Sequence, residues 1–152
     1  MKRLELMNRV RSLTRDFNKT AFRDLDVIAY INEGVGRMQQ IISQLNQMTE
    51  LTYDEAEPIV LPKSYHHLLA VYCSSRLFAQ DERFHQASTL MNEFETKMNE
   101  LLMSLTNGEV VAKNPDGSTV DVSLKPFYVK NNYFDMRNKQ YDKDEGVEGV
   151  PY

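Results

Sequence analysis

Two adjacent histidines, His66 and His67, are the first residues of this 152-residue chain whose type suggests chemistry. A neutral imidazole is a common metal ligand, and it changes charge near neutral pH. Adjacent residues of a helix diverge by about 100°, so these two side chains do not easily bind one ion. Neither has a second histidine three or four positions away, and His85 lies beyond a predicted helix break. We therefore predict surface or rim histidines and no metal site.

Cys73 is the single cysteine, which excludes an internal disulfide and any site that needs several thiolates. It lies in an apolar stretch, so we expect it to be half-buried, and a catalytic thiol would need a base close to it in space. The chain has no nucleophile elbow, phosphate-binding glycine loop or zinc-protease helix motif. The sequence thus favours a protein that is not an enzyme and uses no cofactor.

Charge is distributed unevenly along the chain. Residues 1–23 hold seven bases and two acids, residues 24–122 hold six bases and fifteen acids, and the last thirty residues hold five of each. This asymmetry suits head-to-tail contact between copies, and it equally suits a basic end that faces nucleic acid. The overall charge of −4 is not that of a dedicated nucleic-acid-binding protein. The predicted contact residues in either case are Arg3, Arg9, Arg11 and Arg15.

An acidic cluster, Asp54, Glu55 and Glu57, offers oxygen ligands for a hard cation. It lacks the regularly alternating ligands of a calcium loop. We expect a solvated loop, or one that meets the basic first helix of a neighbouring subunit, followed by a strand-like segment at 59–62.

The elements that must position these groups are helices. A short amphipathic helix is predicted over 4–13, and Asp24 could cap a second helix of about 25 residues. Gly34 and Gly36 lie inside the second helix, which indicates close packing against a neighbour or a bend. Its apolar stripe consists of Ile28, Ile31, Val35, Met38, Ile42 and Leu45.

Two further helices follow the acidic loop. Pro62 can open the first of them, because a proline at the first helical position loses no needed hydrogen bond. The second has an apolar stripe that begins at Phe84 and ends at Leu105, and Asn107–Gly108 forms its stop signal. The sequence therefore predicts a mainly α protein, an antiparallel bundle of three to four helices over residues 1–106.

After the bundle the pattern changes twice. Residues 107–122 contain two β-prone runs around Pro115, Asp116 and Gly117, which predicts a β-hairpin that leans on the bundle or on another subunit. Residues 123–152 hold too few aliphatic side chains to form a core, and they predict an extended C-terminal arm that orders on a partner. The arm carries six of the fifteen aromatic residues as predicted anchors: Phe127, Tyr128, Tyr133, Phe134, Tyr141 and Tyr152.

Targeting signals are not evident. The longest apolar runs, such as Leu101–Met103, are far shorter than the roughly 20 residues that a membrane span needs. Lys2 and Arg3 are not followed by an apolar segment, so we expect no secretory signal.

Four segments in their order along the chain resemble the head-to-tail connector adaptors of tailed bacteriophages. They are Asp26–Gly34, Ile59–Leu69 with its apolar-Pro-x-x-Tyr motif, Tyr72–Leu77, and Phe94–Glu95. The motifs are short, and the resemblance covers roughly residues 12–105.

The resemblance implies a non-catalytic virion protein, made in the host cytoplasm and located in the neck at the portal vertex. Such proteins form a ring, typically of twelve copies, that extends the DNA channel and docks the next neck or tail protein. The implied partners are other copies of the chain, the portal protein, the next neck or tail component, and packaged DNA that passes without sequence-specific recognition. Two alternatives stay open: a small DNA-binding or regulatory protein that uses the basic first helix, and a tail completion or stopper protein of the same particle.

Overall fold

The computed structural model describes residues 1–122, which form one compact unit. The predicted arm at 123–152 and its six aromatic residues lie outside the described residues. Residues 107–122 share the core of the helices, because Ala112, Val120 and Val122 are buried in the same hydrophobic cluster. This segment therefore does not stand apart from the bundle.

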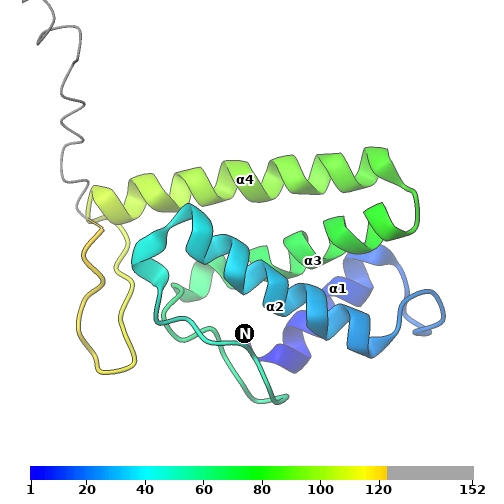
Figure 1. The fold of residues 1–152 in the computed structure, drawn as a ribbon, viewed down its shortest axis with the longest axis horizontal. Helices are drawn as coiled ribbons and strands as arrows, with labels where there is room; N and C mark the ends of the chain where they lie inside the picture. Colours follow the sequence, from blue (N-terminus) through cyan, green and yellow to red (C-terminus); the bar gives the residue numbers. More distant parts are fainter. Residues whose placement is uncertain (123–152) are drawn as a thin grey trace, which may run out of the picture. The chain divides into compact units, whose positions relative to one another are not determined.

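Four α-helices dominate the unit, and the prediction of a mainly helical protein is confirmed. Two short 3-10 turns, η1 and η2, lie between α2 and α3, and no strand occurs within residues 1–122. In Figure 1, α2, α3 and α4 alternate in direction, and α1 lies beside α2 and α3. The helices are α1 (Arg3–Thr14), α2 (Asp24–Ile41), α3 (His67–Gln80) and α4 (Phe84–Thr106), and the turns are η1 (Ser43–Leu45) and η2 (Lys63–Tyr65).

The centre of the unit is α3, which contacts each of the other three α-helices. Ten of its fourteen residues are buried. Its two buried serines are satisfied internally: the Ser74 hydroxyl donates to the Ala70 carbonyl at 2.8 Å, and the Ser75 hydroxyl donates to the Ala87 carbonyl of α4 at 2.7 Å. A helix that is buried on most of its circumference must be covered by several neighbours. For this reason α3 is the central helix of the fold.

The second helix is shorter than its apolar stripe predicts. It ends at Ile41, and Ile42 leaves the helical conformation with φ −122° and ψ 88°. Ile42 and Leu45 are nevertheless fully buried, because the chain continues through η1 along the same core. At Gly34 the expected close packing is confirmed: a Cβ there would lie 3.1 Å from Tyr72 Cδ1 of α3.

Three details of the predicted helices are wrong. Asp24 is the first residue of α2 rather than its cap, and its carboxylate instead accepts a hydrogen bond from Arg11 at 2.7 Å. Phe84, expected in the core, is 65% exposed because it begins α4 directly after the α3–α4 turn. The segment before Pro62 is not a strand, and it packs Val60 and Leu61 into the core as a turn.

The predicted β-hairpin is also not formed as paired strands. Its two runs are joined by one isolated antiparallel bridge, between Lys113 and Thr119. The turn itself is present: Gly117 has a φ of +85°, and its amide donates to the Asn114 carbonyl at 2.9 Å. Ala112, Val120 and Val122 of these runs pack into the core of the helices, and this packing competes with regular pairing between the runs.

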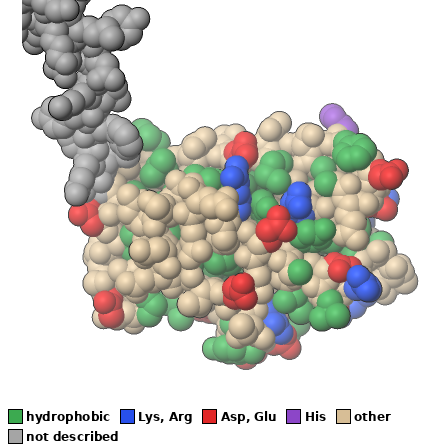
Figure 2. Space-filling model, in the orientation of Figure 1, with side chains coloured by type: hydrophobic (Ala, Val, Ile, Leu, Met, Phe, Trp, Pro, Cys, Tyr) green, Lys and Arg blue, Asp and Glu red, His purple; other side chains and the backbone are tan. Residues whose placement is uncertain are grey.

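The surface mixes charges of both signs. On the face drawn in Figure 2, basic and acidic side chains lie next to one another rather than in separate fields. Within residues 1–122, no helix is long and apolar enough to cross a membrane.

Candidate functional site

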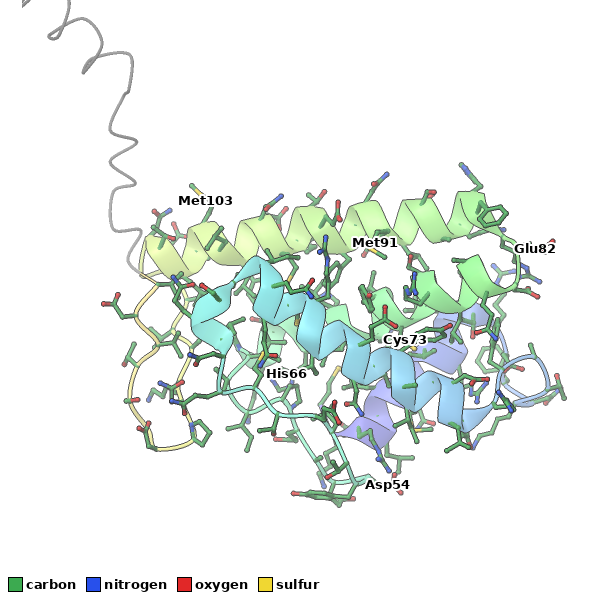
Figure 3. All side chains as sticks on the ribbon, in the orientation of Figure 1. Asp54, His66, Cys73, Glu82, Met91 and Met103 are labelled. Atoms are coloured by element: carbon green, nitrogen blue, oxygen red, sulfur yellow. The ribbon has the colours of Figure 1, made fainter. Side chains whose placement is uncertain are left out.

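The basic start of α1 and the acidic loop meet within one chain. The Arg3 guanidinium donates to the Asp54 carboxylate at 2.6 Å and to the Leu51 carbonyl at 3.2 Å, and Lys2 forms an ion pair with Glu55. The backbone amide of Arg3 also donates to the Ala56 carbonyl at 2.8 Å. Figure 3 shows Asp54 in the loop on the α1 side of the unit. The acidic loop therefore contacts its own first helix, where we expected solvent or a neighbour.

His66 lies beneath this contact and is 1% exposed, so the prediction of a surface or rim histidine is wrong for this residue. Its Nδ1 lies 2.7 Å from the Met1 amine, and its Nε2 lies 2.7 Å from the Leu61 carbonyl. Both contacts fit a neutral ring that accepts at Nδ1 and donates at Nε2. Burial lowers the pKa of His66, and the adjacent Met1 amine lowers it further, against the opposing effects of the Leu61 hydrogen bond and the Glu57 charge.

A second ion-pair cluster organises the loop between α1 and α2. Arg11 is 4% exposed and pairs with the buried Asp16, and its second nitrogen donates to Asp24 at 2.7 Å. The Asp16 carboxylate also accepts three backbone N–H bonds, from Thr20 at 2.9 Å, Ala21 at 3.1 Å and Phe22 at 3.1 Å. Burial by itself raises the pKa of Asp16, but the three N–H bonds and the Arg11 charge together hold it below its ordinary value.

The four arginines that we predicted as intermolecular contacts thus separate into two pairs. Arg11 is buried in an internal ion pair, and most of Arg3 is covered by the acidic loop, with a side chain only 12% exposed. The prediction that Arg11 contacts a partner is therefore wrong. Arg3 has little exposed surface left for such a contact. Arg9 and Arg15 are exposed and have no ion pair among the described residues.

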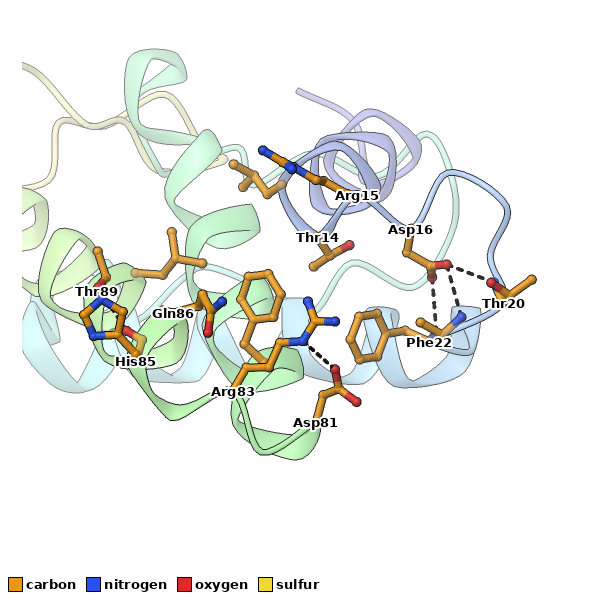
Figure 4. Close-up of a pocket in the computed structure, with 14 residues that line it drawn as sticks. Thr14, Arg15, Asp16, Thr20, Phe22, Asp81, Arg83, His85, Gln86 and Thr89 are labelled. Carbon is orange, nitrogen blue, oxygen red and sulfur yellow. Dashed lines mark hydrogen bonds and ion pairs between the residues drawn. The ribbon is translucent and has the colours of Figure 1, made fainter.

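A pocket of about 830 Å³ lies between the α1–α2 loop and the α3–α4 turn. Phe22 and Phe78 are buried in its wall, and Arg15, Arg83 and His85 lie along it. Figure 4 shows Arg15 on the α1 side, and Arg83 and His85 on the side of α3 and α4. The sequence did not predict this site, because its residues come from two stretches, 13–22 and 78–90, that lie far apart along the chain.

Nucleophilic chemistry receives no support at Cys73. Its thiol is fully buried rather than half-buried, and it donates a weak hydrogen bond to the Val27 carbonyl at 3.4 Å. Burial raises the pKa of the Cys73 thiol, which disfavours the reactive thiolate. Residues 1–122 contain no group of three or more His, Cys, Asp or Glu side chains that could hold a metal ion.

The predicted turn residues lie at the surface of the unit. Pro115, Asp116 and Gly117 are exposed. The Asp116 carboxylate accepts hydrogen bonds from the amide and hydroxyl of Ser118, at 2.8 and 2.6 Å. The loop tip is thus internally ordered and presents a defined shape to solvent.

Comparisons with protein-family models, curated proteins and solved structures find no match to this chain.

Proposed function

We propose that this protein is a structural component of a tailed-phage virion, a head-to-tail connector adaptor. Copies of the chain would form a ring beneath the portal, extend the DNA channel and dock the next neck or tail component. The arm at 123–152 would bind the portal through its aromatic residues, and the exposed turn at Pro115–Gly117 would contact a neighbouring subunit or the next ring.

The observation that carries the proposal is the way in which the chain enters α3. Leu61 is 1% exposed, Pro62 has the extended ψ of 137°, and η2 then leads into α3. This is the apolar-Pro-x-x-Tyr segment on which the resemblance rests, and here it anchors the central helix of a mainly helical unit. This placement of the motif, directly before the central helix, supports the proposal.

The DNA-binding alternative is less well supported. Its basic helix would present four arginines to phosphates, but Arg11 is buried and Arg3 is held by Asp54. Each lost phosphate contact lowers both affinity and its salt dependence. Of the four predicted contacts only Arg9 and Arg15 are exposed, on a chain whose net charge is −4.

The proposal is tested by mixing the purified full-length chain with purified portal rings of the same phage and imaging the mixture by electron cryomicroscopy. We expect a ring of helical density on the portal, and no such density on portal alone. Imaging of intact virions places the chain independently. Absence from the neck would overturn the proposal, and location at the tail side of the channel would support the stopper protein instead.

A further inference from the structure

The pocket between the α1–α2 loop and the α3–α4 turn is lined by both apolar and polar side chains. Its apolar wall includes Phe22 and Phe78, each 7% exposed, and the half-buried Leu90. Its volume, about 830 Å³, lies in the range of pockets that enclose sizeable ligands. These side chains give a ligand's aromatic or aliphatic groups an apolar surface to contact.

The pocket is lined by two arginines and two aspartates, together with the exposed His85. Arg15 lines it without an ion pair among the described residues, and His85 is exposed beside it. Arg83 lies over the Phe78 ring at 5.6 Å from its centroid and pairs with the exposed Asp81 at 2.9 Å. The carboxylate of Asp16 is already occupied by Arg11 and three backbone amides. The pocket therefore suits an acidic peptide that carries apolar side chains.

The end of this chain has that chemistry. Residues 141–152 hold four acids and one base, whereas residues 123–140 hold four bases and one acid. The same twelve residues include Tyr141, Val147, Val150 and Tyr152. Charge and apolar content thus both make the last twelve residues complementary to the pocket.

The exit of the chain and the pocket lie at opposite ends of α4. The Thr106 hydroxyl contacts the Val122 carbonyl at 3.4 Å, so the described chain ends beside the last turn of α4. His85 lies in the first turn, about 32 Å away along a helix of 1.5 Å rise. Thirty residues can span up to about 100 Å. If residues 123–152 of one copy bind the pocket of the next copy, the two ends of α4 provide a head-to-tail link between copies. Such a link closes into a ring if the rotation between neighbouring copies permits it.

We propose that residues 141–152 of one copy bind in the pocket of a second copy, with carboxylates against Arg15, Arg83 and His85 and apolar side chains against Phe22 and Phe78. This inference rests on the proposed function, since it names a contact between subunits of the ring. It assigns the end of the arm to the neighbouring subunit and leaves the preceding aromatic residues, at 127–134, for the portal.

The first experiment measures self-association of the full chain by sedimentation velocity at low salt, without portal. Reversing the pocket charges with Arg15→Glu and Arg83→Glu should weaken self-association by at least about tenfold. Changing the four acids of 141–152 to lysine should do the same, and combining both sets in one chain should restore association. Lys63→Glu, an exposed charge reversal outside the pocket, is the matched control and should have no effect. Failure of the combined variant to recover, with its helical circular dichroism intact, would overturn the proposal.

The second experiment needs no charge variant. A photo-cross-linking residue at Thr89, which lines the pocket, is placed in the full chain, and ¹⁴N- and ¹⁵N-labelled copies are mixed. Cross-links from position 89 to 141–152 that join the two isotopes support the proposal, and the same cross-linker at the exposed Asn46 should give none. Cross-links confined to one copy, or no cross-links to residues 141–152, would overturn the proposal. Loss of cross-linking at position 89 when DNA alone is added would also overturn it. Because portal is absent, failure here and failure of portal binding are separate results.

Discussion

The guanidinium of Arg11 and the carboxylate of Asp16 form a buried ion pair that closes the loop between α1 and α2. The same carboxylate accepts hydrogen bonds from three backbone N–H groups of this loop. The loop is also one wall of the pocket. The Arg11–Asp16 pair therefore holds one wall of the candidate binding site in place.

Removing the acid of this pair should be strongly destabilising. Asp16→Ala leaves the Arg11 charge buried and three backbone donors unpaired, and we expect a loss of about 3–5 kcal/mol in the free energy of unfolding. Urea denaturation followed by circular dichroism measures it. Glu100→Gln, which breaks the exposed Lys97–Glu100 pair, should leave the midpoint nearly unchanged. Equal midpoints for the two variants would show that Asp16 does not hold the loop.

His66 should make stability depend on pH. Its pKa is lowered in the folded chain, so below about pH 6.5 the unfolded chain binds a proton that the folded chain resists. Stability is then complete above that pH and falls as the pH drops below it. The melting temperature, measured from pH 7.5 to 5.0, should decrease, and His66→Gln should remove most of this slope. The exposed His85→Gln should retain it, and an equal slope in all three proteins would contradict the assignment.

The two glycines of α2 should respond in opposite ways to alanine. At Gly36 a Cβ has nothing within 4 Å, so Gly36→Ala should stabilise the protein by about 0.5–1 kcal/mol through helix propensity. At Gly34 the Cβ would lie 3.1 Å from the Tyr72 ring, which packs on Phe94 and donates to Glu33 at 2.8 Å. Because that ring is held on both sides, Gly34→Ala should destabilise by about 1 kcal/mol. Thermal denaturation of the two variants measures both effects. Stabilisation by both substitutions would show that the Tyr72 ring moves aside to accept the new Cβ.

The aromatic residues of the arm should matter for portal binding. Replacing Phe127, Tyr128, Tyr133 and Phe134 together by alanine should weaken the binding of the full chain to purified portal by at least about a hundredfold, because a few aromatic anchors usually carry most of the binding energy. Biolayer interferometry measures the affinity, and unchanged helical circular dichroism controls for folding. A portal affinity equal to that of the wild type would show that these four residues do not bind the portal.

Much of the helical content could be predicted from the sequence, because amphipathic periodicity is a local property. The stripes of α2 and α4 mark their buried faces, and the burial of Val35, Met38 and Phe94 follows directly from them. The early end of α2 at Ile41 could not be predicted, because the apolar spacing continues unchanged through η1. Periodicity reports which residues face a core, not which backbone conformation brings them there.

The sequence by itself determined that this is a mainly helical chain with a basic start, an acidic middle and an aromatic final segment, because composition and spacing are enough for these properties. Only the tertiary structure decided which charges remain available to a partner. Arg11 and Arg15 are four residues apart on a basic segment, yet one is buried against Asp16 and the other faces the pocket. His66 and His67 are adjacent, yet only His66 is enclosed. Burial depends on contacts with residues far along the chain, and no local pattern encodes those contacts.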